Sequence, residues 1–217
     1  MDKFTTANVM SAIEIMADVA IENEVAFCEL DSAAGDGDFG MSLAKGFKQL
    51  KAEWQDLDKD SIGSFLRSAG MVILENCGGA SGPLWGSAFR GAAKAAGDIS
   101  EAGVAELAEM LQAAVAAIQK TGARSFGRGA VVGDKTMIDA LVPLADSLSA
   151  SAEAGEQLKP AFIKAAKAAV DGAESTKGFT AKMGRAANVG ERSLSFPDAG
   201  AFAIGLIFTT IAEKLLA

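Results

Sequence analysis

Apolar residues recur at spacings of three and four along most of the chain, which is the spacing of amphipathic α-helices. Val9, Ile13 and Met16 show it in the first such stretch, where they fall near one side of the expected helix. No segment alternates apolar and polar residues as a half-buried strand would. The pattern therefore predicts an all-α fold of eight helices, over residues 6–22, 41–54, 61–76, 83–97, 100–120, 135–150, 160–176 and 198–216.

Several of these helix starts carry residues that suit the first turn of a helix. Asp60 or Ser61 can cap the third helix and Ser100 the fifth, because their side-chain oxygens can accept hydrogen bonds from free N–H groups. Pro83 suits the first position of the fourth helix, where no N–H donor is needed. Asp198 is a candidate cap for the eighth helix.

The connections between the helices are of two kinds. Those after the second, fourth and sixth helices are ordinary linkers, whereas those after the first, third, fifth and seventh are rich in glycine and polar groups. Successive loops of an up-and-down helical array alternate between its two ends. We therefore expect the four polar loops to meet at one end and to form one composite site. They are DSAAGDGDFG at 31–40, GGASG at 78–82, GRG at 127–129 with GDKT at 133–136, and GRAANVGER at 184–192.

The first polar loop is a candidate metal site. Asp31, Asp36 and Asp38 supply three carboxylates within eight residues, and magnesium is typically held by a few carboxylates together with substrate phosphates. The alternative is a solvated acidic turn, which Asp and Gly also favour. A calcium-binding EF-hand is excluded, because Ser42 and Phe47 stand where such a loop needs Glu.

Two other polar loops offer groups that can bind phosphate. Residues 78–82 lead into a helix, whose free N–H groups and dipole favour an anion, and Ser81 adds a hydroxyl group. Arg185 and Arg192 can each grip phosphate with two donors in fixed geometry. A tight helix–helix turn and ordinary surface arginines are the alternatives for these segments.

Residues 129–136 resemble a Walker A phosphate loop only superficially. The glycine spacing is too short, Asp134 stands directly before Lys135, and the segment follows a helix where a Walker A loop follows a strand. Capping of the sixth helix by Asp134 and a ligand role are both open interpretations of this segment.

Charge and composition narrow the classes of partner. The formal net charge is −8 and no run of Lys or Arg interrupts the acidic balance, so we expect no nucleic-acid or membrane partner. Cys28 and Cys77 are expected to be buried, reduced thiols. The longest apolar stretch, residues 199–211, is too short to span a bilayer. Since no signal-peptide pattern opens the chain, we expect a cytoplasmic protein.

Four motifs, in order along the chain, resemble the nucleotide-binding L domain of dihydroxyacetone kinases. The resemblance covers nearly the whole chain and implies a single nucleotide-binding kinase domain over residues 1–217. It also implies an antiparallel up-and-down barrel of eight helices with the nucleotide at one end. The motifs are GDGDFG at 35–40, GGASGPLWG at 78–86, GDKTMIDAL at 133–141, and GRAANVGERS at 184–193 followed by PDAGA at 197–201.

The resemblance implies a site that holds ATP or ADP through magnesium. Asp31, Asp36 and Asp38 would hold two Mg²⁺ ions that bridge the nucleotide phosphates. Arg185 would contact the terminal phosphates as the catalytic residue, since phosphoryl transfer depends mostly on positioning and charge neutralisation. The residues implied to bind the nucleotide are Phe39, Gly40, Met41, Ser42, Ala80, Ser81, Gly129, Met137, Arg185, Asp198, Ala199 and Gly200.

Three positions depart from the family pattern. Phe39 stands where members that use phosphoenolpyruvate as the phosphate donor carry His, and relatives that use ATP vary there. Val189 replaces a common aromatic residue, and Ala199 replaces the Pro of a DPGA motif. Phe39 therefore favours ATP as the donor.

The family binds its ketone through a histidine on a separate K domain, and this chain contains no histidine. A Ser-His-Asp triad is excluded for the same reason. We therefore expect a subunit that phosphorylates dihydroxyacetone or a related small ketose only with a K-type partner. Three alternatives stay open: an ADP-cofactor subunit of a phosphoenolpyruvate-dependent phosphotransferase served by a phospho-carrier protein, a non-catalytic nucleotide-sensing regulatory module, and a fatty-acid kinase-like enzyme.

Overall fold

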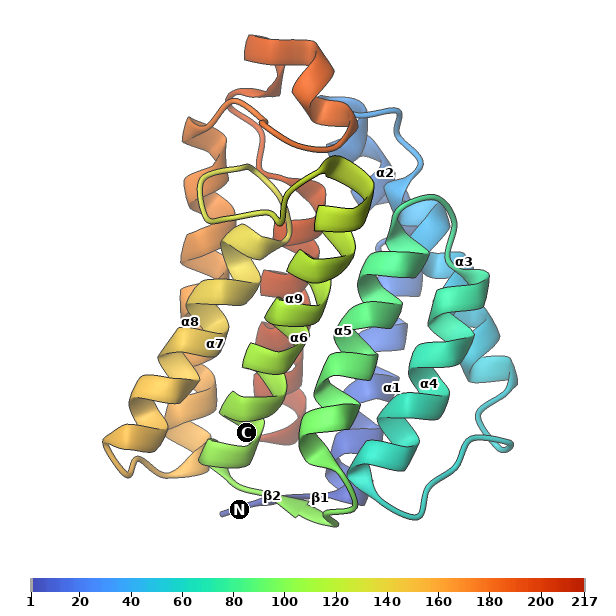
Figure 1. The fold of residues 1–217 in the computed structure, drawn as a ribbon, viewed down its shortest axis with the longest axis vertical. Coiled ribbons are helices and arrows are strands. Elements are labelled where there is room, and N and C mark those ends of the chain that lie inside the picture. The colour runs from blue at the N-terminus through green and yellow to red at the C-terminus, as the bar shows by residue number, and fades with distance from the viewer. Residues whose placement is uncertain (1, 217) are drawn as a thin grey trace.

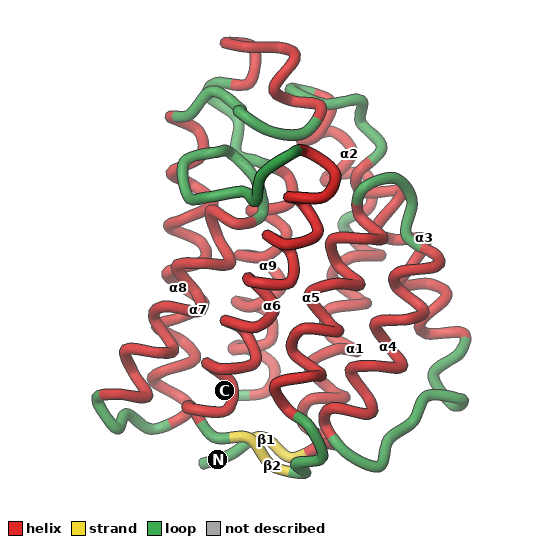
Figure 2. The backbone as a smooth tube through the Cα atoms, in the orientation of Figure 1, coloured by secondary structure: helices red, strands yellow, loops and turns green. Residues whose placement is uncertain are grey.

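The computed structural model describes residues 2–216 and shows a mainly helical chain (Figures 1 and 2). One short antiparallel ladder joins β1 (Phe4–Thr5) to β2 (Glu101–Ala102). Two 3₁₀ segments, Thr176–Gly178 and Arg185–Ser193, lie between the last two helices. The α-helices of the described residues are α1 (Thr6–Glu22), α2 (Glu24–Ser32), α3 (Phe39–Ala52), α4 (Ile62–Asn76), α5 (Ser81–Ala96), α6 (Val104–Phe126), α7 (Ile138–Glu153), α8 (Leu158–Ser175) and α9 (Ala199–Leu215).

Eight of these helices form a closed ring. Each helix from α3 to α9 packs against the next in sequence, and α1 closes the ring by packing against both α3 and α9. Successive ring helices run up and down (Figure 1). The helix α2 was not expected from the sequence; it extends beyond the end of α1 and packs mainly on α3. The prediction of an all-α fold of eight antiparallel helices is confirmed for the ring.

The helix α1 shows how the sequence determines an element. Thr5 and Asn8 form a capping box, in which each side chain accepts a hydrogen bond from the other's backbone N–H, at 3.3 and 3.0 Å. Val9, Ile13 and Met16 are all buried, as their spacing predicts. The predicted bounds of this helix agree with those observed.

The predicted cap at Ser100 is wrong, because a short ladder precedes α6. The Ser100 carbonyl accepts a hydrogen bond from the Thr6 N–H at 2.9 Å, next to the pairing of β1 with β2. The helix begins after Gly103, whose N–H donates to the Glu106 carboxylate at 2.8 Å. A ladder of two residues per strand is too short to show an alternating pattern, so it could not be predicted from the spacing of apolar residues.

Of the two open interpretations of Asp134, the structure excludes the helix cap. Both oxygens of this carboxylate accept hydrogen bonds from the Arg128 guanidinium, at 2.5 and 2.9 Å. The helix α7 begins at Ile138, later than predicted, and has no side-chain cap. Ser61 and Asp198 do cap α4 and α9, as predicted.

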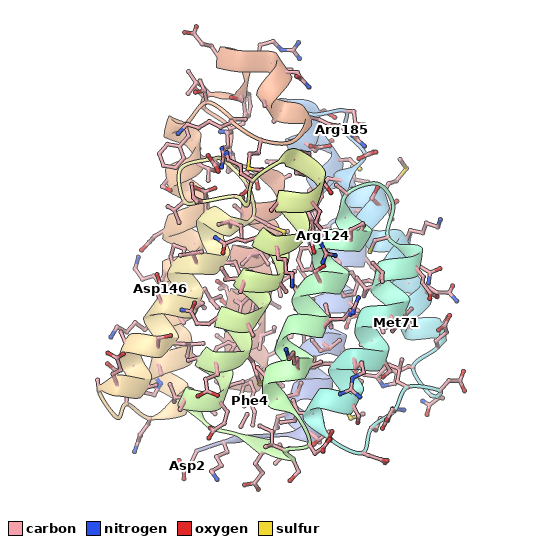
Figure 3. The ribbon with its side chains drawn as sticks, in the orientation of Figure 1. Asp2, Phe4, Met71, Arg124, Asp146 and Arg185 are labelled. Atoms are coloured by element: carbon pink, nitrogen blue, oxygen red, sulfur yellow. The ribbon has the colours of Figure 1, made fainter. Side chains whose placement is uncertain are left out.

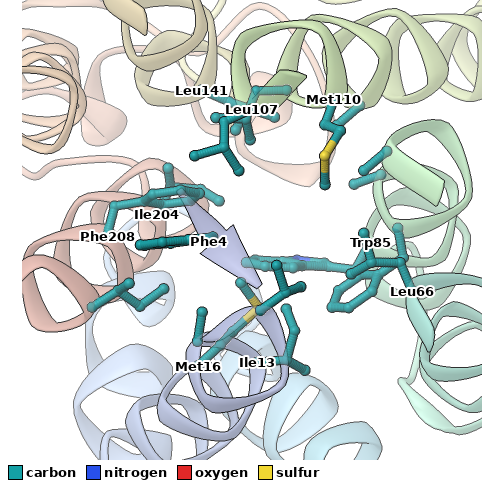
Figure 4. Close-up of a pocket in the computed structure, with 18 of the residues that line it drawn as sticks. Phe4, Ile13, Met16, Leu66, Trp85, Leu107, Met110, Leu141, Ile204 and Phe208 are labelled. Carbon is teal, nitrogen blue, oxygen red and sulfur yellow. The ribbon is translucent and has the colours of Figure 1, made fainter. Parts of the chain in front are cut away.

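The ring encloses an apolar cavity of about 140 Å³ along its axis (Figure 4). Phe4 of β1 reaches into the cavity from the ladder, and Phe208 of α9 and Leu66 of α4 line it from opposite parts of the ring. Trp85 and Met137 line both this cavity and the polar cleft at the other end of the ring. These two side chains therefore form the boundary between the core and the candidate site.

Both cysteines are free thiols, and no disulfide joins the described residues. Cys77 is buried as predicted, and burial raises the pKa of its thiol to about 11. Cys28 is only half-buried, so the expectation of a buried thiol is wrong there. Within residues 2–216, no helix combines the length and apolar character that crossing a membrane requires.

Candidate functional site

The four polar loops meet at one end of the ring, as the alternation of loops predicts. They connect α2 to α3, α4 to α5, α6 to α7, and α8 to α9, all at the upper end in Figure 1. Together they line one open cleft. Its lining consists of Asp31, Asp36, Asp38, Phe39, Gly78, Ala80, Ser81, Leu84, Trp85, Lys135, Thr136, Met137, Met183, Gly184, Arg185, Ala186, Asp198, Ala199 and Gly200.

Three carboxylates form one wall of this cleft. Asp31 lies in the last turn of α2, and Asp36 and Asp38 lie in the loop that follows. One carboxylate oxygen from each aspartate lies within 4.8 Å of the corresponding oxygens of the other two. The three oxygens are therefore close enough to share a cation. Gly37 lies between the two loop aspartates with φ +74°, a conformation that favours glycine. Oxygen-only donors at this spacing fit a hard divalent cation such as Mg²⁺.

Arg185 reaches these carboxylates from the loop before α9 (Figure 3). Its Nη1 donates to the Asp36 carboxylate and, at 3.0 Å, to the Asp38 carboxylate. Its other terminal nitrogen lies beside Gly79, where an added β-carbon would come within 3.4 Å. The guanidinium therefore spans the cleft between the carboxylates and the loop that precedes α5.

The start of α5 forms the side of the cleft next to Gly79. The helix begins at Ser81, two residues earlier than predicted, and its N-cap residue Ala80 has no side chain that can accept a hydrogen bond. The Ser81 N–H donates to the Gly78 carbonyl at 3.2 Å and Pro83 has no N–H, so the Gly82 N–H is the free donor of this first turn. Free N–H groups at a helix start, with the positive end of the helix dipole, can bind a phosphate group.

Asp198 closes the cleft at the start of α9. Its carboxylate accepts a hydrogen bond from the Ala201 N–H at 2.8 Å, which fixes it as the cap of the helix. Burial raises the pKa of this carboxyl to about 7, and the nearby carboxylates of Asp139 and Asp31 add to the rise. The hydrogen bond from Ala201 and the charge of Lys135 act in the opposite direction. The cleft therefore contains one carboxyl group that titrates near neutral pH.

Four of the residues implied to bind nucleotide do not line this cleft: Gly40, Met41, Ser42 and Gly129. Met41 and Ser42 line a neighbouring depression, which shares Gly78 with the cleft. Gly40 packs against the backbone of α2, where a β-carbon would clash, and a β-carbon on Gly129 would make a tight contact of 3.0 Å with the Gln119 carbonyl oxygen of α6. The two glycines therefore allow close packing against a neighbouring helix, and neither belongs to the cleft lining.

Sequence reasoning missed several cleft residues. Leu84, Trp85 and Met183 are apolar, and only the rotation of a helix or the course of a loop brings them to the cleft. Lys135 also lines it, although only 2% of its surface is exposed. The one feature of the sequence that could have pointed to Lys135 is its place as a single cation in a glycine-rich turn before a helix. Arg192, in contrast, is exposed and lies outside the cleft lining.

The sequence of this chain is similar to those of known proteins over most of its length. Residues 33–213 match the family model of the DAK2 domain. The L-erythrulose 1-kinase of Mycolicibacterium smegmatis is 33% identical over 210 residues, which are 96% of this chain and 35% of that protein. The ADP-binding subunit of PEP-dependent dihydroxyacetone kinase 1 of Listeria innocua is 33% identical over 88% of both chains. The corresponding subunit of Escherichia coli is 34% identical over 84% of both chains.

Among solved structures, the dihydroxyacetone kinase of C. freundii has the same fold. The TM-score is 0.73 for its native form and 0.70 for its complex with AMP-PNP and Mg²⁺. In both cases 25% of the aligned residues are identical, over 96% of this chain and 34% of that chain. This chain therefore spans about a third of the erythrulose kinase and of the C. freundii kinase, and most of the two ADP-binding subunits.

Proposed function

Because the chain belongs to the DAK2 domain family, we propose that it binds ADP or ATP with magnesium and transfers phosphate to a small ketose held by a partner subunit. One observation carries this proposal. Three carboxylates, an arginine and an uncapped helix start lie in a single cleft, although they come from separate parts of the sequence. The similarity to a kinase solved with AMP-PNP and Mg²⁺ supports the same assignment.

In the proposed site, Asp31, Asp36 and Asp38 hold two magnesium ions, which would neutralise charge on the nucleotide phosphates. The N–H groups around Ala80 and Ser81 bind phosphate oxygens. The other proposed nucleotide contacts are Phe39, Met137, Asp198, Ala199 and Gly200, which line the cleft, and Met41 and Ser42, which line the neighbouring depression.

Arg185 is the proposed catalytic residue. Its present acceptors are two carboxylates that a bound cation would engage, which would leave its guanidinium available to the terminal phosphate. A planar cation with several donors can stabilise charge on a transferring phosphoryl group. The Arg185 side chain lies beside the start of α5, so it is already close to the proposed phosphate position.

The ketose is proposed to bind on a separate K-type subunit, because this chain has no histidine to hold it. The surface of the cleft end supports a docked partner. Six of the nine exposed large apolar side chains in the described residues lie in α2, in the loops at that end, or in the helix turns next to those loops. They are Val25, Met41, Phe126, Val131, Val132 and Phe196.

We propose free ATP as the phosphate donor. Phe39 lines the cleft at the position where members that use phosphoenolpyruvate carry His, and its phenyl ring can offer the nucleotide neither a hydrogen bond nor a charge. The second candidate is a subunit that keeps ADP as a cofactor. It is favoured by the relatives that match over most of both chains, which are named as ADP-binding subunits of PEP-dependent kinases.

Two measurements test the proposal. The purified chain, passed through gel filtration in magnesium without nucleotide and then denatured, should release little ADP, and it should bind added ADP only with magnesium. With a K-type subunit and a ketose it should consume ATP, whereas alone it should not. Stoichiometric ADP after the column, with no turnover on ATP, would establish the second candidate instead. Absence of any magnesium-dependent nucleotide binding would disprove both.

A further inference from the structure

We propose that Lys135 is a positioning residue, which clasps the two ends of the loop that carries Arg185 and so fixes the place of the guanidinium in the cleft. The expected effect of Lys135 on catalysis rests on the proposed function. The claim that its buried ammonium group holds the loop closed rests only on the observed hydrogen bonds.

The Lys135 ammonium group joins the start and the end of that loop. Its Nζ donates to the carbonyl oxygen of Thr176 at 2.5 Å and to that of Phe196 at 2.7 Å. These two carbonyls lie twenty residues apart in sequence, at the base of the segment 177–195. No carboxylate of the described residues pairs with this ammonium group, so its hydrogen bonds go to the two ends of the loop.

The base of the loop is further closed by two backbone donors. The Ser195 N–H donates to the Lys177 carbonyl at 2.9 Å, and the Asp198 N–H donates to the Thr176 hydroxyl at 2.8 Å. Beyond the base, the backbone of the loop is tied to the rest of the chain by the Lys182 N–H, which donates to the Asp134 carbonyl at 3.0 Å. Apart from the ion pairs of Arg185 itself, the hydrogen bonds that hold this loop therefore gather at its base, where Lys135 acts.

Lys135 occupies this position at some cost to folding. Its φ is +63°, in the left-handed region that residues other than glycine rarely adopt, and burial lowers the pKa of its ammonium group. Strained backbone and buried charge persist where the surrounding structure requires them, and they concentrate at functional sites. From this backbone conformation the Lys135 side chain reaches both ends of the loop that carries Arg185.

The first test is proteolysis of the metal-free chain with trypsin, which can cut after Lys177, Lys182, Arg185 and Arg192. Lys135→Met should raise the rate of cleavage at these four sites roughly tenfold, because cleavage follows local opening. The control Lys164→Met removes an ion pair with Glu156 at the far end of α8 and should leave the rate unchanged. An unchanged rate in Lys135→Met would overturn the clasp. This test needs no nucleotide, so it decides the clasp even if the proposed function is wrong.

The second test is a double-mutant cycle with Arg185→Ala, measured with the K-type partner as kcat and KM and on the chain alone as magnesium–ADP affinity. If Lys135 acts through Arg185, then Lys135→Met lowers kcat in the wild-type background and has less than about a twofold further effect in Arg185→Ala. Equal losses in both backgrounds would show that Lys135 contacts the nucleotide directly or supports only the fold, and would overturn the proposal.

If Lys135→Met does not fold, Thr176→Val loosens the same base without changing the lysine. It removes the hydroxyl that accepts from the Asp198 N–H and preserves the size of a fully buried side chain. We expect faster cleavage at the same four tryptic sites and the same non-additivity with Arg185→Ala. Unchanged cleavage in Thr176→Val would overturn the proposal in that case.

Discussion

At the scale of single residues, the most informative group is the set of three aspartates that faces Arg185. Carboxylates this close repel one another unless a cation lies among them, and in this structure the guanidinium is the cation beside Asp36 and Asp38. The same carboxylates can therefore be balanced in two ways, by the arginine or by a metal ion.

We expect Asp36→Asn and Asp38→Asn each to abolish magnesium-dependent nucleotide binding without unfolding the chain. The fold should tolerate both changes, because exposed ion pairs contribute only about 0–1 kcal/mol. Calorimetric titration of ADP with and without magnesium measures the loss, and thermal unfolding measures the stability. Asp171→Asn, which breaks an exposed pair with Lys167 on α8, is the matched control. Unchanged affinity in both cleft variants would remove the metal site from this loop.

Arg185→Ala should weaken magnesium–nucleotide binding or transfer, and Arg192→Ala should do much less. A hydrogen bond to a charged group contributes about 1.5–3 kcal/mol, which corresponds to a loss of roughly ten- to a hundredfold. Only Arg185 lines the cleft, while Arg192 lies on the exposed face of the same loop. Affinity and kcat of the two variants, measured side by side, check the difference. Similar, negligible effects would place the loop outside the site.

Asp198 should make the metal-free chain less stable as the pH rises from about 5 to 8. Its pKa is raised to about 7 by burial, so the folded chain keeps a proton there that the unfolded chain has released, and this stabilisation is lost as the pH passes the folded pKa. Asp198→Asn keeps an oxygen for the Ala201 N–H and does not titrate. Urea unfolding of both proteins across this range should show the wild type losing stability relative to the variant. A constant difference between them would contradict the raised pKa.

At the scale of elements, the sequence predicted the ring helices well, and the reason is physical. Each ring helix buries one continuous apolar face against its two neighbours, and a face of that kind leaves a clear spacing of apolar residues. The helix α2 was missed because only Phe27 of its nine residues is buried, so it has no such face. The predicted alternation of the loops between the two ends is still correct, because α2 extends α1 and does not fold back beside it (Figure 1).

The candidate site was predictable only in part. Asp31, Asp36, Asp38 and Arg185 could be found because they are polar residues in glycine-rich loops that alternate along the chain. The role of Lys135 could not be predicted, because it depends on two carbonyl groups far along the sequence. A glycine in such a loop can serve either close packing against a neighbouring helix or ligand binding, and the two roles leave the same pattern in the sequence.

The stability of a single helix can be tested at its N-terminal cap. Ser61→Ala should lower the free energy of unfolding by about 1 kcal/mol, because it leaves the N–H of Ser64 without its side-chain acceptor at the start of α4. Ser68→Ala, inside the same helix, should change stability by less than about 0.5 kcal/mol, as for most substitutions that remove no cap or core contact. Urea unfolding of the two variants gives both values. An equal effect would mean that the Ser61 cap does not hold α4.

At the scale of the whole molecule, the two ends of the ring differ in structure. The ladder and the ordinary linkers lie at one end, and the four polar loops lie at the other (Figure 2). The apolar cavity between them shares Trp85 and Met137 with the cleft, so the floor of the candidate site is also the upper limit of the core. Larger or smaller side chains at either position should therefore affect stability and ligand binding together.

Because α1 packs against both α3 and α9, the packing of the ring does not depend on which helix comes first in the sequence. The start of α1 and the end of α9 lie side by side, since these helices are antiparallel neighbours, so a short flexible linker can join them. A circular permutant that opens instead at Gly155, an exposed residue in the tight turn between α7 and α8, should fold and keep magnesium-dependent nucleotide binding. A permutant that opens between Gly184 and Arg185 should fold and lose that binding. Helix content by circular dichroism and ADP titration distinguish the two, and loss of fold in the first permutant would show that the order of the helices matters as much as their ring.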